Sequence, residues 1–131
     1  MSEGNIEQLR RAYSAWERGD WAGQVRLAPD VHCSWQVPEG HAEARGSQET
    51  ERNFREFLRQ WSSFRVEARE FIEIDENSIL VVTHSHATGK HSGVETESTI
   101  FHAWVFRGDE AVEWHSYFDR DGALEAAGLS E

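Results

Sequence analysis

The sequence has few lysines, few cysteines and no long hydrophobic run. One lysine, Lys90, and a formal net charge of −11 leave no basic stripe that could neutralise nucleic-acid phosphates. One cysteine, Cys33, excludes a disulfide within the chain, and no apolar segment approaches the roughly 18 residues of a membrane-spanning helix. Residues 1–4 also lack the basic and apolar regions of a secretion signal. We therefore expect a cytoplasmic protein that binds neither nucleic acid nor membranes.

The chain does contain enough apolar material for a folded core. Hydrophobic residues make up 38% of its 131 residues, with seven phenylalanines and six tryptophans. This composition is far from that of disordered segments, and the length suits one domain, which we place over 1–131. The acidic excess by itself indicates only a well-solvated surface.

The first half of the chain has helical periodicity in three places. Apolar residues at spacings of three and four predict an amphipathic helix over 5–18, which Gly19 would end. A short helix is predicted over 21–27, where Pro29 would break it. Another helix is predicted over 47–61. Its apolar side consists of Phe54, Phe57, Leu58 and Trp61.

The remaining segments have the pattern of strands. A short strand is predicted over 31–37, and 38–46 has the composition of a loop. After residue 63 the apolar period changes to two, which predicts further strands at 64–74, 79–89, 94–106 and 111–118, then a short helix over 123–127. Short links between these strands favour antiparallel pairing. This order predicts an α+β domain whose helices cover one face of a strongly curved sheet.

Alternation along the strands divides the side chains between two faces. The face that combines large apolar groups with a few polar ones suits a cavity wall. We assign to it Thr83, Ser85, His102, Trp104, Trp114, Ser116 and Phe118. The opposite face carries His84, His86, His115 and Tyr117, and we expect it to be convex and solvated or to form a dimer contact. A register shift of one residue would exchange the two sets.

Four segments resemble SnoaL-like members of the NTF2-like superfamily. They are 9–21 (LRRAYSAWERGDW), 28–31 (APDV), 101–106 (FHAWVF) and 117–129 (YFDRDGALEAAGL). The resemblance implies a cone-shaped α+β fold: a curved antiparallel sheet whose concave face is covered by helices, with a pocket between them. It also implies a homodimer formed through the convex face. Because the superfamily includes isomerases, cyclases, dehydratases, epoxide hydrolases and non-catalytic binding proteins, the resemblance leaves the reaction open.

His102 is the first candidate for catalysis. It is an imidazole on an otherwise apolar strand face, where its pKa is readily tuned toward neutrality. By the resemblance, it falls where ketosteroid isomerases carry a protonated, oxyanion-stabilising aspartate. The alternative is a structural histidine bonded to Tyr13 or to a backbone carbonyl. Steroid isomerisation itself is not expected, because the isomerase base corresponds to Val37 or Gln36 and its tyrosine to Ala12.

Asp119 is the second candidate for catalysis. By the resemblance, it lies within one residue of the acid/base aspartate of polyketide cyclases in this superfamily. Together with His102 it could remove a proton from a substrate and return it. The alternative is that Asp119 caps the helix that follows, a role that Asp121 could also take.

Aromatic residues dominate the predicted ligand site. We expect a ligand to contact Tyr13, Trp16, Trp35, Val37, Phe54, Phe57, Trp61, Ser85, Trp104, Trp114, Ser116 and Phe118. Large rigid rings suit a flat, apolar, ring-containing small molecule, which Ser85 and Ser116 would orient by hydrogen bonds. A tryptophan-rich core without a ligand is the alternative. Cys33 has no basic neighbour in the sequence and is interpreted as a packing residue.

No metal or cofactor is expected. His84, His86 and His115 would suit zinc if their strands were in register, but no cysteine or carboxylate stands at a recognisable spacing. We therefore predict a small-molecule pocket protein. It is either a cofactor-free isomerase, cyclase or dehydratase that acts by proton transfer, or a non-catalytic ligand-binding or dimerisation module.

Overall fold

The computed structural model describes residues 2–21, 25–37 and 40–129, which form three helices and six strands. In chain order these are α1 (Ser2–Glu17), β1 (Leu27–Val37), β2 (Gly40–Arg45), α2 (Ser47–Leu58), β3 (Trp61–Asp75), β4 (Ser78–Gly89), β5 (Glu95–Arg107), β6 (Glu110–Tyr117) and α3 (Arg120–Ala126). Among these residues, no helix is both long and apolar enough to cross a membrane.

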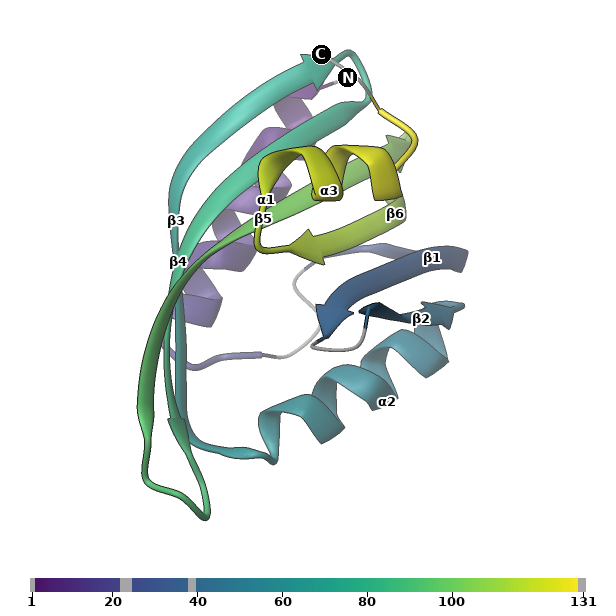
Figure 1. Cartoon of the computed structure of the whole chain (residues 1–131). Helices are drawn as coiled ribbons and strands as arrows, with labels where there is room; N and C mark the ends of the chain where they lie inside the picture. Colours follow the sequence, from purple (N-terminus) through teal and green to yellow (C-terminus); the bar gives the residue numbers. More distant parts are fainter. Residues whose placement is uncertain (1, 22–24, 38–39, 130–131) are drawn as a thin grey trace.

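The strands form one open, mixed sheet in the order β2-β1-β6-β5-β4-β3. The long strands β3, β4 and β5 bend along their length, so that the sheet has a concave and a convex face (Figure 1). β1 pairs antiparallel with β2, and β3, β4, β5 and β6 pair antiparallel in succession, as expected, but β1 lies parallel to β6. The expected sheet was wholly antiparallel; this pair differs because β1 and β6 are distant in sequence and need no hairpin. The α+β fold with a cone-shaped sheet is confirmed.

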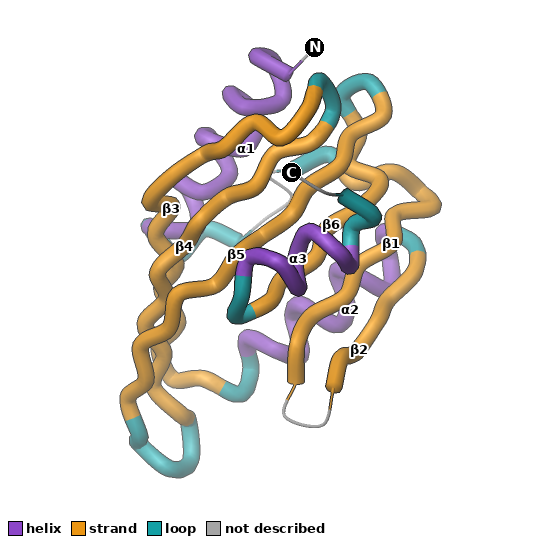
Figure 2. Tube along the Cα trace, turned by 45° about the horizontal axis from the view of Figure 1, so that its top comes forward, coloured by secondary structure: helices purple, strands orange, loops and turns teal. Residues whose placement is uncertain are grey.

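Helices lie on both faces of the sheet, as Figure 2 shows. On the concave face, Leu9 and Tyr13 of α1 pack in a core with Val81, Trp104 and other strand residues. On the convex face, α3 covers a smaller apolar cluster that includes Leu80. The prediction that helices cover the concave face therefore holds for α1 and α2. The expectation that one face is free of helices is wrong, because the apolar half of the convex face also needs cover.

Most elements lie where the periodicity predicted them. The helix expected over 5–18 is α1, and Gly19 follows it with φ 83°, the left-handed conformation that ends many helices. The helix expected over 47–61 ends at Leu58, and Trp61 already begins β3. The four strands expected after residue 63 are β3 to β6, and the helix expected over 123–127 is α3.

Two predictions between α1 and α2 are wrong. The helix expected over 21–27 is absent from its described residues, since Leu27 already belongs to β1; 22–24 lie outside the described residues. Pro29 sits inside β1, at a register shift against β6, where a strand tolerates proline. The loop expected over 38–46 contains β2, although 38–39 are not described. The polar composition of β2 is that of an edge strand.

Candidate functional site

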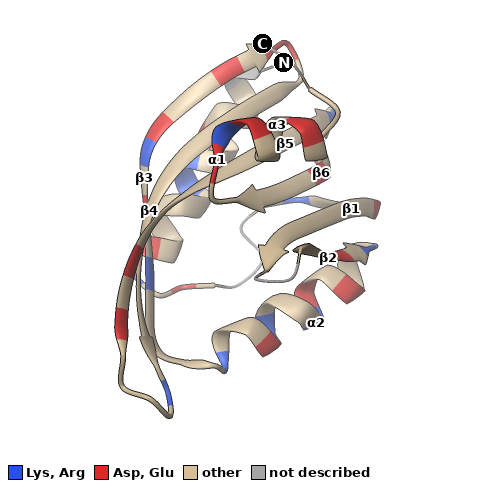
Figure 3. Ribbon diagram, in the orientation of Figure 1, with Lys and Arg blue, Asp and Glu red and all other residues tan. Residues whose placement is uncertain are grey.

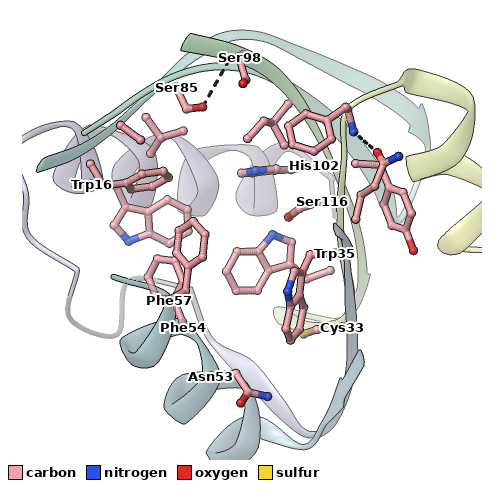
Figure 4. Close-up of a pocket in the computed structure, with 18 of the residues that line it drawn as sticks. Trp16, Cys33, Trp35, Asn53, Phe54, Phe57, Ser85, Ser98, His102 and Ser116 are labelled. Carbon is pink, nitrogen blue, oxygen red and sulfur yellow. Dashed lines mark hydrogen bonds between the residues drawn. The ribbon is translucent and has the colours of Figure 1, made fainter. Parts of the chain in front are cut away.

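A cavity of about 270 Å³ lies between α1, α2 and the concave face of the sheet. Figure 4 shows Phe54 and Phe57 of α2 on one side of it and Ser85, Ser98 and His102 of the sheet on another. Its volume lies near the lower end of the range for small-molecule pockets. The helices thus leave a space large enough for a compact ligand.

Aromatic rings form most of the cavity wall. The indoles of Trp16 and Trp114 stack with ring centres 6.1 Å apart, and Trp21 and Phe54 lie beside Trp16. Trp104 stacks behind Trp114 at 4.7 Å and is fully buried in the core. The tryptophans therefore serve both purposes left open by the sequence: some fill the core and others surround a cavity.

His102 is held by a chain of hydrogen bonds behind the cavity wall. The Trp104 indole N–H donates to the Tyr13 hydroxyl over 3.0 Å, and that hydroxyl lies 2.5 Å from Nδ1 of His102. The Tyr13 oxygen already accepts from Trp104, so its own proton is free to bond His102 Nδ1. This arrangement leaves Nε2 of His102 as the protonated ring nitrogen.

The surroundings of His102 keep its ring uncharged. Burial lowers the pKa of His102 to about 3. Burial likewise raises the pKa of Tyr13 above its ordinary value. Both groups are therefore neutral near pH 7. An imidazole with so low a pKa is a weak proton acceptor, but its Nε2–H can donate a hydrogen bond to a ligand.

The cavity wall carries no full charge. Among the described residues that line it, none is Asp, Glu, Lys or Arg. Charged residues instead occur along α2, β3, β5 and α3 (Figure 3). Burial raises the pKa of the Cys33 thiol to about 12, so this wall residue is protonated, as its interpretation as a packing residue requires. The site suits an uncharged ligand.

Three residues that line the cavity have indole N–H groups without a hydrogen-bond partner among the residues that the structure describes. These groups are the Nε1 atoms of Trp16, Trp61 and Trp114, all buried from solvent. Buried donors almost always find a partner in folded proteins, because leaving one unpaired costs about 1–3 kcal/mol. Because these three nitrogens have no accessible surface, they are closed off from the cavity as well as from bulk solvent, and a ligand would reach them only after the rings turn.

Most of the predicted site residues line the cavity. They are Trp16, Trp35, Phe54, Phe57, Trp61, Ser85, His102, Trp114, Ser116 and Phe118. Ser116 is the register partner of His102 on β6, and Ser85 donates a 3.4 Å hydrogen bond to the Ser98 carbonyl. These positions agree with the alternation argument, whereas Tyr117, which that argument placed on the opposite face, also lines the cavity.

Four predicted site residues lie outside the cavity wall. Tyr13 and Trp104 are buried behind it, because α1 packs directly against the sheet there. Val37 lies at the end of β1 and is the register partner of Gly40 on β2. Asp119 is the N-cap of α3, and its carboxylate accepts a hydrogen bond from the Gly122 N–H over 2.8 Å. The geometry thus matches the capping alternative for Asp119.

The cavity also contains residues that the sequence did not predict. They are Trp21, Cys33, Ser34, Gln36, Thr50, Asn53, Phe64, Val66, Ala87, Thr96, Ser98, Ile100 and Tyr117. Alternation along β3 could have identified Phe64 and Val66, and Thr50 lies one helical turn before Phe54. Trp21 has no periodic signal, because it lies between α1 and β1.

The three histidines considered for zinc do not meet. His84 and His86 lie together with Glu97 of β5 on the convex face. His115 lies instead beside His32 and Glu113, on the strands β1 and β6. That set would have required β4 and β6 to be neighbours, whereas β5 separates them.

Comparisons with known proteins agree with this architecture. The model of the SnoaL-like domain family matches residues 9–114. A search of curated proteins finds no significant match. An NTF2-like protein of unknown function from Burkholderia pseudomallei K96243 is 26% identical, with a TM-score of 0.73 over 93% of this chain and 95% of that one.

Two further solved structures share the fold at lower identity. TerC, crystallised with polyporic acid, is 22% identical, with a TM-score of 0.70 over 95% of this chain and 98% of that one. A protein of ketosteroid isomerase-like fold from Catenulispora acidiphila DSM 44928, in complex with trimethylamine, is 14% identical, with a TM-score of 0.71 over 95% and 94%. With the family model covering most of its length, the chain belongs to the SnoaL-like domain family and has the NTF2-like fold.

Proposed function

We propose that this protein binds a flat, uncharged, ring-containing small molecule that carries a hydrogen-bond acceptor such as a carbonyl oxygen. The observation that carries the proposal is an uncharged, largely aromatic cavity wall that includes the neutral ring of His102. Parallel rings such as Trp16 and Trp114 favour a flat ligand. The acceptor would receive a hydrogen bond from Nε2–H of His102, a bond that a pure hydrocarbon could not accept.

The related structures support a small-molecule role for this fold. TerC was crystallised with polyporic acid, and the Catenulispora acidiphila protein is in complex with trimethylamine. Neither ligand is carried over to this chain, whose own cavity wall defines the ligand class.

Cofactor-free proton transfer is a second candidate, favoured by the place of His102 in the cavity wall. In an isomerisation, cyclisation or dehydration through an enol, the His102 Nε2–H would donate to the substrate oxygen and stabilise the negative charge that develops there. The neutral imidazole is suited to this donor role rather than to removal of the proton. Binding is the first candidate because the described wall offers no carboxylate base.

Binding can be tested with two probes that differ only in the acceptor. We expect 2-acetylnaphthalene to quench the tryptophan fluorescence and to bind about tenfold more tightly than 2-ethylnaphthalene, since hydrogen bonds formed by otherwise unpaired donors are worth about 1–2 kcal/mol. A His102→Leu variant should lose part of this preference, whereas His102→Gln keeps a donor. Equal affinity for the two probes, or binding of neither, would contradict the proposal.

The same ketone also tests catalysis. Its methyl protons exchange with D2O through an enol, and NMR follows the exchange directly. If the protein catalyses proton transfer, exchange should be faster than in buffer and slower again in the His102→Leu variant. Exchange at the buffer rate, with the ketone bound, would remove the catalytic candidate and leave binding.

A further inference from the structure

A second cluster of polar side chains lies outside the cavity, on the convex face where β1 and β6 run parallel. His32 of β1 is the register partner of Glu113 on β6, and His115 follows two residues later on the same face. The His115 side chain is completely buried, and those of His32 and Glu113 are 21% and 29% exposed. The proposed function uses none of these three groups.

The three side chains point to one place. Oε1 of Glu113 lies 2.7 Å from Nε2 of His115 and 3.1 Å from Nδ1 of His32. One ligand atom from each residue lies within 4.8 Å of the other two. Two imidazole nitrogens and a carboxylate oxygen are the ligands of many zinc sites.

The spacing suits a tetrahedral ion after a small adjustment. With metal–ligand distances of about 2.0–2.2 Å, two ligands of a tetrahedral zinc ion lie about 3.3 Å apart. The distance from Glu113 Oε1 to His115 Nε2 therefore needs to open by about 0.6 Å, and the distance to His32 Nδ1 by about 0.2 Å. The partial exposure of His32 and Glu113 leaves room for water as a fourth ligand.

In each histidine, the ring nitrogen that faces away from Glu113 already has a hydrogen-bond partner. Nδ1 of His115 lies 2.6 Å from the Ser34 hydroxyl, and Nε2 of His32 lies 2.8 Å from a carboxylate oxygen of Glu43. Histidines that bind metals almost always bond through their other nitrogen to such a group, which fixes the orientation of the ring. The carboxylates of Glu43 and Glu113 also give the cluster the negative charge that attracts a cation.

We propose that His32, Glu113 and His115 bind one divalent transition-metal ion such as Zn²⁺, which links β1 to β6 on the convex face. The ion would stabilise the parallel pair, because a ligand that binds only the folded chain raises its stability.

The cluster of His84, His86 and Glu97 provides a matched control. It has the same residue types on the same face, but its side chains are 25%, 42% and 65% exposed. A surface pair of histidines binds metal weakly unless its rings are held in place. Comparing the two clusters therefore distinguishes metal binding at a site with fixed ligands from weak metal binding by exposed histidines.

The test is titration of protein without a histidine tag with ZnCl₂, followed by calorimetry and by thermal unfolding. We expect one ion per chain and a higher Tm, both reversed by EDTA. His32→Ala and Glu113→Gln should abolish the shift in Tm. Ser34→Ala should weaken zinc binding by about tenfold, because the Ser34 hydroxyl fixes the orientation of the His115 ring. His84→Ala should bind as the parent does.

Several results would overturn the proposal. They are the absence of stoichiometric binding to the parent chain, loss of binding in His84→Ala, and unchanged binding in both His32→Ala and Glu113→Gln. Because the parent chain alone must bind one ion, the test stands even if one of the variants fails to fold.

Discussion

The Tyr13 hydroxyl links two buried groups, accepting from Trp104 Nε1 and bonding His102 Nδ1. Tyr13→Phe would leave both of those groups without a partner while keeping the ring. Since each buried unpaired group costs about 1–3 kcal/mol, we expect the free energy of unfolding to fall by at least about 2 kcal/mol. Urea denaturation measures this change.

The other tyrosine of the chain is a matched control. Tyr117 bonds the Ser34 hydroxyl over 2.9 Å and is only half-buried, and Ser34 also bonds His115. Tyr117→Phe should therefore cost less than about 1.5 kcal/mol. A loss from Tyr13→Phe no larger than that from Tyr117→Phe would show that the buried chain of hydrogen bonds is not needed for stability.

His102 should make the folded protein sensitive to acid. The pKa of His102 is about 3 in the folded protein and 6.5 in an unperturbed side chain. Between these pH values the unfolded chain binds a proton at His102 and the folded chain does not. Proton uptake by the unfolded chain therefore leaves the free energy of unfolding unchanged above about pH 6.5 and lowers it progressively as the pH falls from 6.5 toward 3. Between about pH 6 and 5 the parent should lose up to about 1.4 kcal/mol more stability than His102→Gln.

Urea unfolding of both proteins at these two pH values measures the difference. Carboxylates and the other histidines are common to both chains, so their titration cancels in the comparison. Equal losses of stability in the two proteins would mean that His102 takes up its proton as readily in the folded state as in the unfolded state.

At the scale of secondary-structure elements, Asp119 begins α3. Asp119→Ala removes the hydrogen bond to the Gly122 N–H, which should cost about 1 kcal/mol of stability, and Asp119→Ser should recover most of it. Because Asp119 is outside the cavity wall, affinity for 2-acetylnaphthalene should stay the same. Chemical denaturation and fluorescence titration measure the two effects. Weaker binding with unchanged stability would instead support the catalytic role considered for Asp119.

At the scale of the whole molecule, the convex face has two halves. α3 covers the apolar half around Leu80 and Ala103. The half formed by the other end of β4 and β5 carries His84, His86 and Glu97 and is open to solvent. We propose that the homodimer predicted from the family resemblance uses this polar half, which α3 leaves uncovered.

We expect sedimentation velocity to show a dimer that His86→Glu weakens, because the new carboxylate would face Glu97 across the strand pair. Arg52→Glu, an exposed position on α2, is the control for added negative charge and should leave the dimer intact. A monomeric parent chain, or equal effects of the two substitutions, would contradict a dimer through this surface.

Local patterns in the sequence determined much of the fold and of the cavity wall. The change of apolar period from 3.6 to two predicted α1, α2 and β3 to β6, because those periods follow from the geometry of a helix or strand itself. Alternation placed Ser85, His102 and Trp114 on the cavity face for the same reason. The polar edge strand β2 gave no such signal, since only its pairing with β1 reveals it.

Other properties were decided only by the tertiary structure. Which concave-face residues reach the cavity depends on where α1 packs, so Trp104 lies in the core and Trp114 on the wall. The lowered pKa of His102 and the meeting of His32 with Glu113 arise from groups far apart in the chain. Periodicity describes which way a side chain points within its own element, whereas burial and contact depend on the elements that pack around it.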